Sequence, residues 1–333
     1  MKILITGGAG FIGSNFIRYI LKKYKNYKIF NLDKLTYCGN LNNLRDVEKN
    51  PNYYFFKGDI CDKKIVEKLV KKVDAIINFA AESHVDRSIL EPESFIKTNF
   101  FGTYVLLEAG KKYKIKKFIQ IGTDEEYGSI KKGYFKETDP LNPSSPYSAS
   151  KAGASLLSLS YFKTFKLPVI VTRSTNNFGP YQYPEKIIPL FITNLLEGKK
   201  VPLYGKGLQR RDWLYVLDNC KAIDLIFHKG KIGEIYNVAG GNEFSNKDLT
   251  KIILKKLGKD ESWIEYVKDR PGHDFRYGID CQKIKKLGWR PIYNFEKALD
   301  ETINWYKNNE WWWKPIKSGE FLKYYQKQYG KKK

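Results

Sequence analysis

Residues that could carry acid–base chemistry gather between positions 123 and 151. Thr123, Asp124 and Glu125 follow one another where an expected strand ends, and Tyr147 and Lys151 are four residues apart on an expected helix. Residues at this spacing share a helix face, so we expect the Lys151 ammonium to lower the pKa of the Tyr147 phenol. The tyrosinate could then take a proton from a substrate hydroxyl.

Two carboxyl groups beside such a pair could divide acid and base work between them. A simple alcohol dehydrogenase does not require that division. Thr123 precedes the pair, and its hydroxyl could meet the same substrate oxygen as the tyrosine.

The spacing of Tyr147 and Lys151 is weak evidence by itself, because the chain contains eight tyrosines followed four residues later by lysine. The setting of Tyr147 is more specific: a proline-containing loop, 143–146, ends and a helix is expected to begin. The nearest competitor is Tyr127 with Lys131, where Gly128 interrupts a helix.

A second group of residues suggests a dinucleotide site. The first expected strand runs into a glycine-rich turn that opens a helix, where backbone N–H groups can approach a pyrophosphate. Asp33 ends the next strand, twenty residues past the last glycine, where a carboxylate can accept from a ribose hydroxyl and repel a 2′-phosphate. The carboxylate of Asp33 therefore favours NAD over NADP, and the positive charge of the following Lys34 slightly weakens that preference. The turn comprises Gly7, Gly10, Phe11, Ile12 and Gly13.

These residues need a scaffold, and the first 175 residues alternate apolar runs with helical patterns. Such alternation predicts an α/β fold, a doubly wound parallel sheet whose ligands bind at the carboxyl ends of the strands. We expect strands at 2–6, 27–32, 53–57, 74–79, 117–122 and 168–173, and helices at 11–25, 63–71, 93–113 and 147–166.

The pattern changes after about residue 176, where short strands mix with helices. We expect a domain over residues 1–175 and a smaller α/β substrate lobe over 176–333, some of whose segments return to the sheet. Ser245 is an expected helix N-cap. The aromatic tail, Trp311 to Trp313, is expected to pack on the domain or a partner. Expected strands are 201–204, 234–238 and 263–267, and expected helices are 185–196, 246–257 and 295–307.

Composition excludes several classes of function. The net charge is +23, but the fifty lysines are spread along the chain without a nucleic-acid motif, so we expect no nucleic-acid partner. No apolar run reaches the ~20 residues that a membrane helix needs. Four scattered cysteines and three histidines argue against disulfides and metal sites. We expect a cytoplasmic protein without metal.

At these residues the chain resembles the dTDP-glucose 4,6-dehydratases of the extended short-chain dehydrogenase/reductase family. The resemblance covers nearly all of the chain. AAESHVDRS and the TDE triplet are particular to the dehydratases. The matching segments include GGAGFIGSNFIR, NLDKLTYCGNL, GDICD, TDEEYG, SPYSASKA, NNFGPYQYPEKIIPL, YGKG, RDWLYV and DRPGHD.

The resemblance implies a Rossmann domain and a reaction sequence. Tyr147, assisted by Lys151 and Thr123, would deprotonate the glucosyl 4-hydroxyl while hydride moves from C4 to NAD. Glu125 would remove the C5 proton, and Asp124 would protonate the departing C6 hydroxyl. Hydride would then return to C6, which makes the enzyme a lyase of deoxysugar (rhamnose-type) biosynthesis.

The resemblance also implies which residues bind the ligands. Further cofactor residues would be Lys34, Leu35, Thr36, Asp59, Ile60, Ala80, Ala81, Ser83, Thr98, Tyr147, Lys151 and Asn177. Substrate residues would be Ser83, His84, Thr123, Asn176, Lys186, Pro202, Tyr204, Arg211, Asn246, Arg270 and His273.

Three positions depart from the family pattern. Gly122 stands where serine is common, a change expected to be neutral. Glu126 replaces an apolar residue; it could point away or raise a neighbour's pKa by repulsion. Arg210 stands where an apolar residue is frequent. The last two leave the fine substrate preference open.

Several alternatives stay open at this point. A UDP-glucose 4,6-dehydratase is the nearest, because the sequence does not choose between thymine and uracil. A nucleotide-sugar epimerase or decarboxylase would lack the Asp-Glu pair, and a silent NAD-sensing scaffold would not need it. The family also implies a homodimer built from the helices at 93–113 and 147–166. Their apolar residues, Phe100, Val105, Leu106, Leu156 and Leu157, would equally serve a core.

Overall fold

The computed structural model describes residues 1–329, and its centre is a seven-stranded sheet. The strand order is β10-β6-β5-β4-β1-β2-β3, and every neighbouring pair is parallel. This confirms the expected doubly wound α/β fold. The strands are β1 (Lys2–Thr6), β2 (Lys28–Asp33), β3 (Tyr53–Lys57), β4 (Ala75–Asn78), β5 (Lys117–Thr123), β6 (Val169–Ser174) and β10 (Ile235–Val238).

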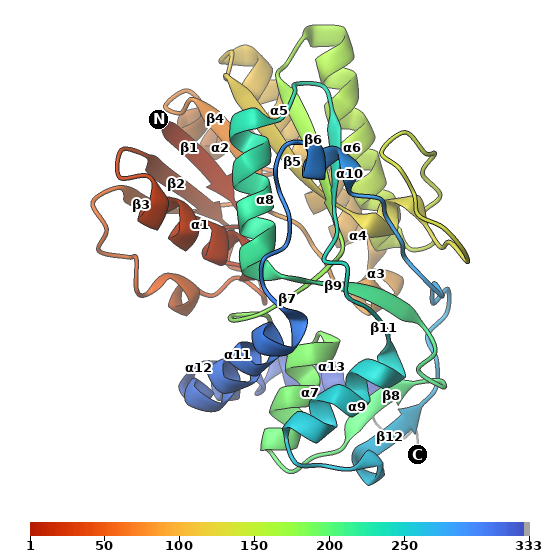
Figure 1. The fold of residues 1–333 in the computed structure, drawn as a ribbon. Coiled ribbons are helices and arrows are strands. Elements are labelled where there is room, and N and C mark those ends of the chain that lie inside the picture. The colour runs from red at the N-terminus through yellow and green to blue at the C-terminus, as the bar shows by residue number, and fades with distance from the viewer. Residues whose placement is uncertain (330–333) are drawn as a thin grey trace.

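Helices cover both faces of the sheet (Figure 1). Ile3 and Ile5 of β1 face one core with α1 (Phe11–Lys23) and α8 (Val216–Lys229), whereas Leu4 faces the other core. Successive strand residues point to opposite faces, so each central strand contributes to both layers. The second layer contains α2 (Lys63–Val70), α5 (Thr103–Lys112) and α6 (Pro146–Phe165).

Between β4 and α5 the chain forms a nearly continuous helical run of three parts. These are α3 (Val85–Leu90), α4 (Pro92–Phe95) and η2 (Ile96–Gly102), where η2 has π-helical hydrogen bonding. The helix expected over 93–113 is therefore present, interrupted by a π segment, and such segments are frequent at functional sites.

The smaller lobe has its own apolar core below the sheet (Figure 1). Trp312 and Trp313 are buried in that core, while Trp311 is exposed. The expected packing of the tail thus holds for two of the three tryptophans. The lobe is built from β7 (Asn176–Phe178), α7 (Ile187–Leu196), β8 (Val201–Tyr204), β9 (Arg210–Tyr215), β11 (Glu243–Ser245), α9 (Asn246–Lys256), η4 (Glu261–Trp263), β12 (Ile264–Val267), α11 (Phe295–Asn308), α12 (Glu310–Ile316) and α13 (Glu320–Tyr329).

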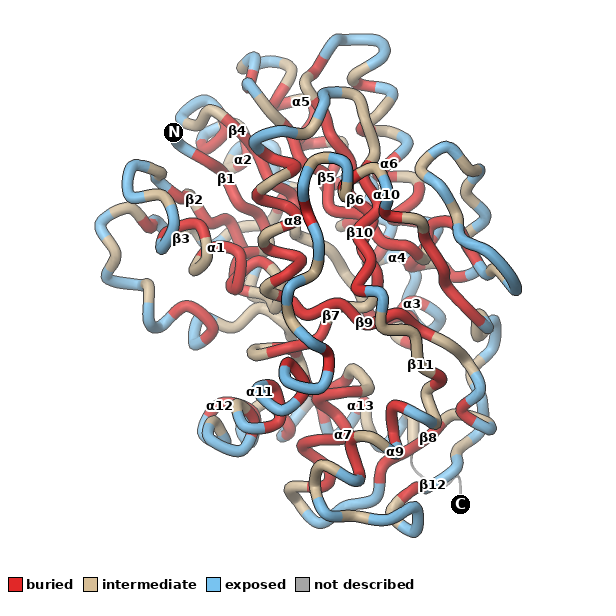
Figure 2. The backbone as a smooth tube through the Cα atoms, in the orientation of Figure 1, coloured by how far each residue is buried: buried red, intermediate tan, exposed pale blue. Residues whose placement is uncertain are grey.

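Two features of the second half cross the expected boundary at residue 175. The helix α8 packs against α1, and β10 pairs with β6 at the edge of the sheet. The short helix α10 (Gln282–Lys286) lies against β10. Figure 2 shows that the sheet strands and the inner faces of these helices are buried, whereas the connecting loops are exposed.

Most element bounds match the expectation within two residues, and Ser245 caps α9 by accepting the Asp248 N–H at 3.0 Å. The helix α8 and the short strands β7, β9 and β11 were not expected. Within residues 1–329, no helix is both long and apolar enough to span a membrane.

Candidate active site

A cavity of about 320 Å³ opens at the carboxyl ends of the sheet strands. All five expected catalytic residues line it, together with residues that follow β1, β2, β3, β4 and β6. This is the edge where the fold predicts ligand binding. The lining catalytic residues are Thr123, Asp124, Glu125, Tyr147 and Lys151.

Nearly every expected cofactor residue lines this cavity; Leu35 does not. Among the expected substrate residues, Ser83, Thr123, Asn176 and Lys186 line it. The remaining ones lie outside its lining: His84, Pro202, Tyr204, Arg211, Asn246, Arg270 and His273.

The glycine turn fits a pyrophosphate because side chains cannot occupy it. A Cβ at Gly13 would lie 2.4 Å from the Gly7 carbonyl oxygen, and Gly7 itself has φ +68°. The helix α1 begins after Gly10 with no side-chain cap, which leaves its first N–H groups without side-chain partners. A helix N-terminus of this kind attracts phosphate oxygens.

The part of the cavity at the end of β2 is arranged around Asp33. Its carboxylate accepts the backbone N–H groups of Ala9 at 2.9 Å and Leu35 at 2.8 Å, which fixes its orientation at the end of β2. Lys34 pairs with Asp59 at 2.9 Å across the same edge. The side-chain amide oxygen of Asn177, a residue that lines the cavity, is buried and has no hydrogen-bond partner. These groups fit NAD.

The catalytic loop is shaped by local hydrogen bonds of Thr123. As the N-cap of η3 (Asp124–Tyr127), Thr123 accepts the Glu125 N–H through its hydroxyl at 3.3 Å. The hydroxyl also donates to Asp124 Oδ1 at 3.2 Å. The acidic pair therefore starts a tight turn whose side chains reach the cavity.

The two carboxyl groups have different surroundings. Burial and the neighbouring Glu125 raise the pKa of Asp124 well above its usual range, and Asp124 Oδ2 has no hydrogen-bond partner. Burial also raises the pKa of Glu125, but Arg270, Lys186 and Arg211 oppose that shift. Such a difference favours a protonated Asp124 and an ionised Glu125.

The expected lowering of the Tyr147 pKa is wrong for this structure. Burial, followed by the nearby Glu125 and Glu126, raises the pKa of Tyr147 well above its ordinary value. Lys151 donates to the Ile121 carbonyl oxygen at 2.5 Å, and burial lowers its own pKa to about 8. Desolvation and the neighbouring carboxylates outweigh the hydrogen bond from Thr123, which is the interaction that lowers the pKa of Tyr147.

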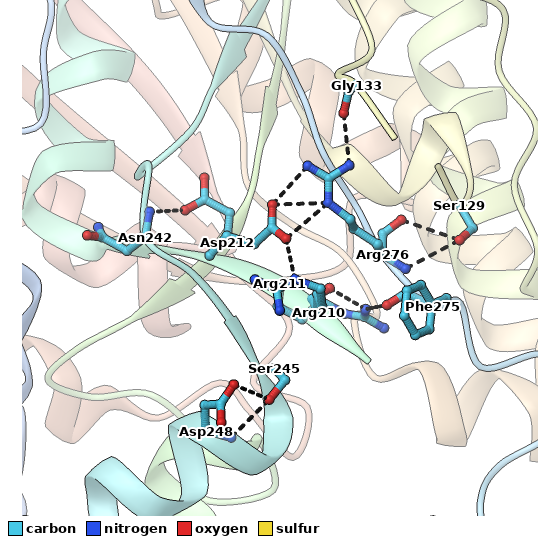
Figure 3. A network of polar contacts seen from close by, with 11 residues as sticks. Ser129, Gly133, Arg210, Arg211, Asp212, Asn242, Ser245, Asp248, Phe275 and Arg276 are labelled. Atoms are coloured by element: carbon cyan, nitrogen blue, oxygen red, sulfur yellow. Dashed lines mark hydrogen bonds and ion pairs between the residues drawn. The ribbon is translucent and has the colours of Figure 1, made fainter. Parts of the chain in front are cut away.

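Arg211 reaches toward the acidic pair from β9 and is held by backbone carbonyls. Its guanidinium donates to the backbone oxygen of Arg210 at 2.7 Å (Figure 3) and to that of Asp274 at 3.0 Å. Arg210 points to Glu243, which it contacts at 2.6 Å and which Arg276 also binds. The third departure from the family pattern thus belongs to a network that supports Arg211.

Two of the residues expected to bind the nucleotide, Tyr204 and Arg270, meet at Asp86. Its carboxylate accepts the Tyr204 hydroxyl at 2.9 Å and Arg270 Nη1 at 3.2 Å. Gln328 of α13 donates to the Tyr204 hydroxyl at 2.6 Å. His273 contacts Asp269 at 2.6 Å. Asp86 and Gln328 were not among the expected residues.

Other supporting residues also escaped the sequence reasoning. Asn99 of η2 is buried and links the loop after β4 to α6, since it exchanges two hydrogen bonds with the Glu82 backbone and donates to Ser150 at 2.9 Å. Glu185 is buried, lines the cavity and pairs with Arg87 at 3.0 Å. Both positions lie in or beside segments with functional motifs, but single residues there give no local signal.

No group of three or more His, Cys, Asp or Glu side chains within residues 1–329 is arranged to hold a metal ion. The groups that line the site are the side chains named above and the backbone of the glycine turn.

Comparisons with known proteins agree with this geometry. The family model for GDP-mannose 4,6 dehydratase matches residues 4–302. A dTDP-glucose 4,6-dehydratase of Streptomyces niveus is 50% identical, with 96% of each chain covered. Two solved structures of dTDP-glucose 4,6-dehydratases also match. That of Bacillus anthracis, in complex with NAD, has 54% identity and TM-score 0.89, covering 95% of this chain and 99% of the other. That of Streptomyces venezuelae, with NAD bound, has 47% identity and TM-score 0.93, covering 95% and 100%. The chain therefore belongs to the dTDP-glucose 4,6-dehydratase family.

Proposed function

We propose that this protein converts dTDP-glucose to dTDP-4-keto-6-deoxyglucose and water. The observation that carries the proposal is the meeting of Thr123, an acidic pair in two different electrostatic surroundings, and the Tyr147/Lys151 pair in one cavity. An epimerase needs the tyrosine and lysine but has no use for two carboxyl groups of unequal pKa. The similarity to relatives of that name supports the substrate.

NAD is the proposed cofactor, held by the glycine turn, Asp33 and Asn177. When bound, it would accept hydride from C4 of the sugar and return hydride to C6. The cradle that excludes a Cβ at Gly13 and the partnerless Asn177 oxygen support this assignment. A carboxylate at Asp33 favours NAD over NADP.

Tyr147 is the proposed base for the sugar 4-hydroxyl. Its raised pKa means that the phenol is neutral before the substrate is engaged. A positive charge or a hydrogen-bond donor brought close to the oxygen would be needed to lower this pKa, and the Thr123 hydroxyl is the nearest such group on the catalytic loop. Lys151 holds its proton below about pH 8.

Glu125 and Asp124 are the proposed base and acid of the elimination. The cations around Glu125 favour its ionised form, which suits removal of the C5 proton of the 4-keto sugar. The burial of Asp124, whose Oδ2 has no hydrogen-bond partner, favours its protonated form, which suits proton donation to the departing C6 hydroxyl. The two roles then require no exchange of protons before the reaction begins.

The same cations are proposed to bind the diphosphate. Lys186, Arg211 and Arg270 all act on Glu125 electrostatically, so a diphosphate held by them would lie beside the elimination machinery. Arginine suits this role because its planar group can bind phosphate oxygens bidentately. Tyr204 and Pro202 of β8 are the proposed contacts of the base.

The first test is incubation of the purified protein with dTDP-glucose and, separately, UDP-glucose, without added reductant. Mass spectrometry should find a product lighter by one water, formed faster from dTDP-glucose. A faster reaction of UDP-glucose would reassign the base. An unchanged mass with inversion at C4 would make the protein an epimerase, and no reaction despite bound NAD would point to another sugar nucleotide.

We also propose a homodimer that joins η2 and α6 of two copies. Ile96 and Leu156 are 57% and 56% exposed, and Phe100, which is also exposed, packs its ring against Gly153. Val105 and Leu106, in contrast, belong to the core under the sheet. A cytoplasmic location stays a prediction, supported by four cysteines that are all unpaired.

A further inference from the structure

Glu126 lies behind the catalytic loop and is fully buried. Its Oε2 pairs with Arg173 Nε of β6 at 2.7 Å. Its Oε1 accepts the Thr123 N–H at 3.1 Å and the Ser155 hydroxyl of α6 at 3.0 Å. One carboxylate thus connects the end of β5, the neighbouring strand β6 and the helix of the tyrosine–lysine pair.

Gly122 provides the space that this carboxylate occupies. A Cβ at position 122 would lie 2.5 Å from Glu126 Oε1 and 2.6 Å from the Thr172 carbonyl oxygen. A side chain there cannot coexist with the observed carboxylate position. The two departures noted at positions 122 and 126 therefore lie in contact, and the backbone carbonyl of Thr172 independently limits the space at position 122.

The negative charge of Glu126 is compensated within the same layer. Arg173 is itself buried, and its guanidinium lies 4.6 Å from the centre of the Tyr127 ring. Tyr127 in turn donates to Asn237 of β10 at 2.9 Å. The ion pair is thus enclosed by ordered partners, which limits its freedom to move.

We propose that Glu126 is a positioning residue, whose carboxylate fixes Thr123 relative to helix α6. The acting groups, Thr123 and Tyr147, come from different elements. Glu126 spans these elements beside the Lys151–Ile121 hydrogen bond, and it alone of the two contacts holds the Thr123 N–H itself; its other partner, Ser155, is one turn after Lys151. Misplacement of a reacting group by about 1 Å lowers the rate on the order of a hundredfold, so the loss of such a contact should lower kcat strongly.

The inference rests on the proposed dehydratase reaction and makes a distinct claim about kinetics. Glu126 does not line the cavity, so its loss should lower kcat and leave KM nearly unchanged. A single substitution would leave Arg173 buried without a counter-ion, which is strongly destabilising. The test therefore removes both charges together.

Two double variants differ only in whether position 126 keeps an oxygen. E126Q/R173M retains an acceptor for the Thr123 N–H and the Ser155 hydroxyl, whereas E126L/R173M retains none. Both variants remove the Glu126 charge, which acts on Tyr147 and Lys151, so the comparison is made between them. We expect kcat of the leucine variant to lie about tenfold or more below that of the glutamine variant at similar KM. E197Q, which removes a partner of Lys317 in the smaller lobe, is the control for ion-pair loss alone.

A readout without turnover accompanies the kinetics. Hydrogen exchange of the Thr123 amide should stay protected in E126Q/R173M and become faster in E126L/R173M. Equal kcat in the two variants, or equal protection of that amide, would overturn the positioning role. Loss of kcat in both variants alike would also overturn it, since the acceptor would then not matter. If the wild-type protein forms no product, the dehydratase assignment is rejected. The hydrogen exchange of the Thr123 amide in the two variants would still test whether Glu126 holds Thr123.

Discussion

Adjacent carboxyl groups in one turn can have opposite tasks when their surroundings differ. Asp124 and Glu125 are both buried, so their common tendency is a raised pKa. The difference comes from elements distant in sequence: Lys186 and Arg270 of the smaller lobe partly oppose the effect of burial on Glu125, whereas Arg211 on β9 opposes it at both carboxyl groups. This charge pattern favours Glu125 as the ionised member of the pair, which agrees with its proposed role as the base.

Replacing Glu125 by glutamine tests that assignment. We expect E125Q to keep its NAD and to oxidise C4, but to form the 4-keto-6-deoxy product at least about a hundredfold more slowly, because the C5 base is gone. Product formation followed by mass spectrometry, together with the NAD content of the purified protein, checks this. A normal rate of water loss would show that the C5 base is another residue.

The depressed pKa of Lys151 predicts a pH-dependent cost to stability. Between its folded pKa of about 8 and the ordinary value of 10.5, the unfolded chain holds a proton that the folded chain has released, so stability rises with pH in this window. Below about pH 8 the full cost, about 3 kcal/mol, is present.

K151M removes this titration and should abolish activity. Its free energy of unfolding should exceed that of wild type at pH 7, and the gap should narrow between about pH 8 and 10.5. Urea unfolding of both proteins at pH 7 and pH 10 measures the gap. A gap that does not change with pH would mean that Lys151 titrates normally in the folded protein.

At the scale of elements, the strand ends were the most predictable part of the site. Buried parallel strands are short apolar runs, so the bounds of β1 and β3 match the expectation and that of β5 is one residue off. The residues after each strand were therefore placed at the correct edge of the sheet. The three-residue strands β7 and β11 were missed because such short segments carry no periodicity.

Contacts between distant elements could not be read from the chain. The pKa of Tyr147 depends on how deeply α6 is buried, and the Glu126–Arg173 pair depends on the register of β5 and β6, which places Gly122 opposite Arg173. The nucleotide end involves α13, from which Gln328 reaches Tyr204. No local sequence pattern predicts these contacts, because each depends on how elements distant in the chain pack together.

The glycine turn makes a prediction about a whole element, the N-terminal end of α1. G13A should weaken NAD binding at least about tenfold, because the added methyl group would meet the Gly7 carbonyl oxygen at 2.4 Å while the helical backbone tolerates alanine. G198A is the control for a general loss of stability away from the site: a Cβ there meets nothing within 4 Å, but the backbone φ of +69° strains an alanine. Calorimetry measures the affinity of both variants for NAD. Equal affinity in G13A and G198A would show that the glycine turn does not contact the cofactor.

For the whole molecule, the proposed homodimer rests on apolar side chains exposed on η2 and α6. Ile96, Phe100 and Leu156 are exposed on these two contacting elements, whereas other exposed leucines such as Leu208 lie elsewhere. Apolar side chains that leave water on association stabilise a dimer.

L156E should convert the proposed dimer into monomers at micromolar concentration, because it places a charge among the apolar side chains of the proposed interface. L208E makes the same change at a leucine of similar exposure and should leave the assembly intact. Light scattering coupled to size-exclusion chromatography reports both masses. A monomeric wild-type protein, or a dimeric L156E variant, would contradict this interface.

The position of β10 at the sheet edge has a consequence for how the protein is made. Its partner β6 ends at Ser174, but β10 ends only at Val238, after much of the smaller lobe has been translated. At a synthesis rate of about 5–20 residues per second, the nascent chain carries an open β6 edge for several seconds. During that interval the edge could pair with another emerging chain, so chaperones that shield nascent segments should raise the yield of native protein most when they act before residue 238 leaves the ribosome.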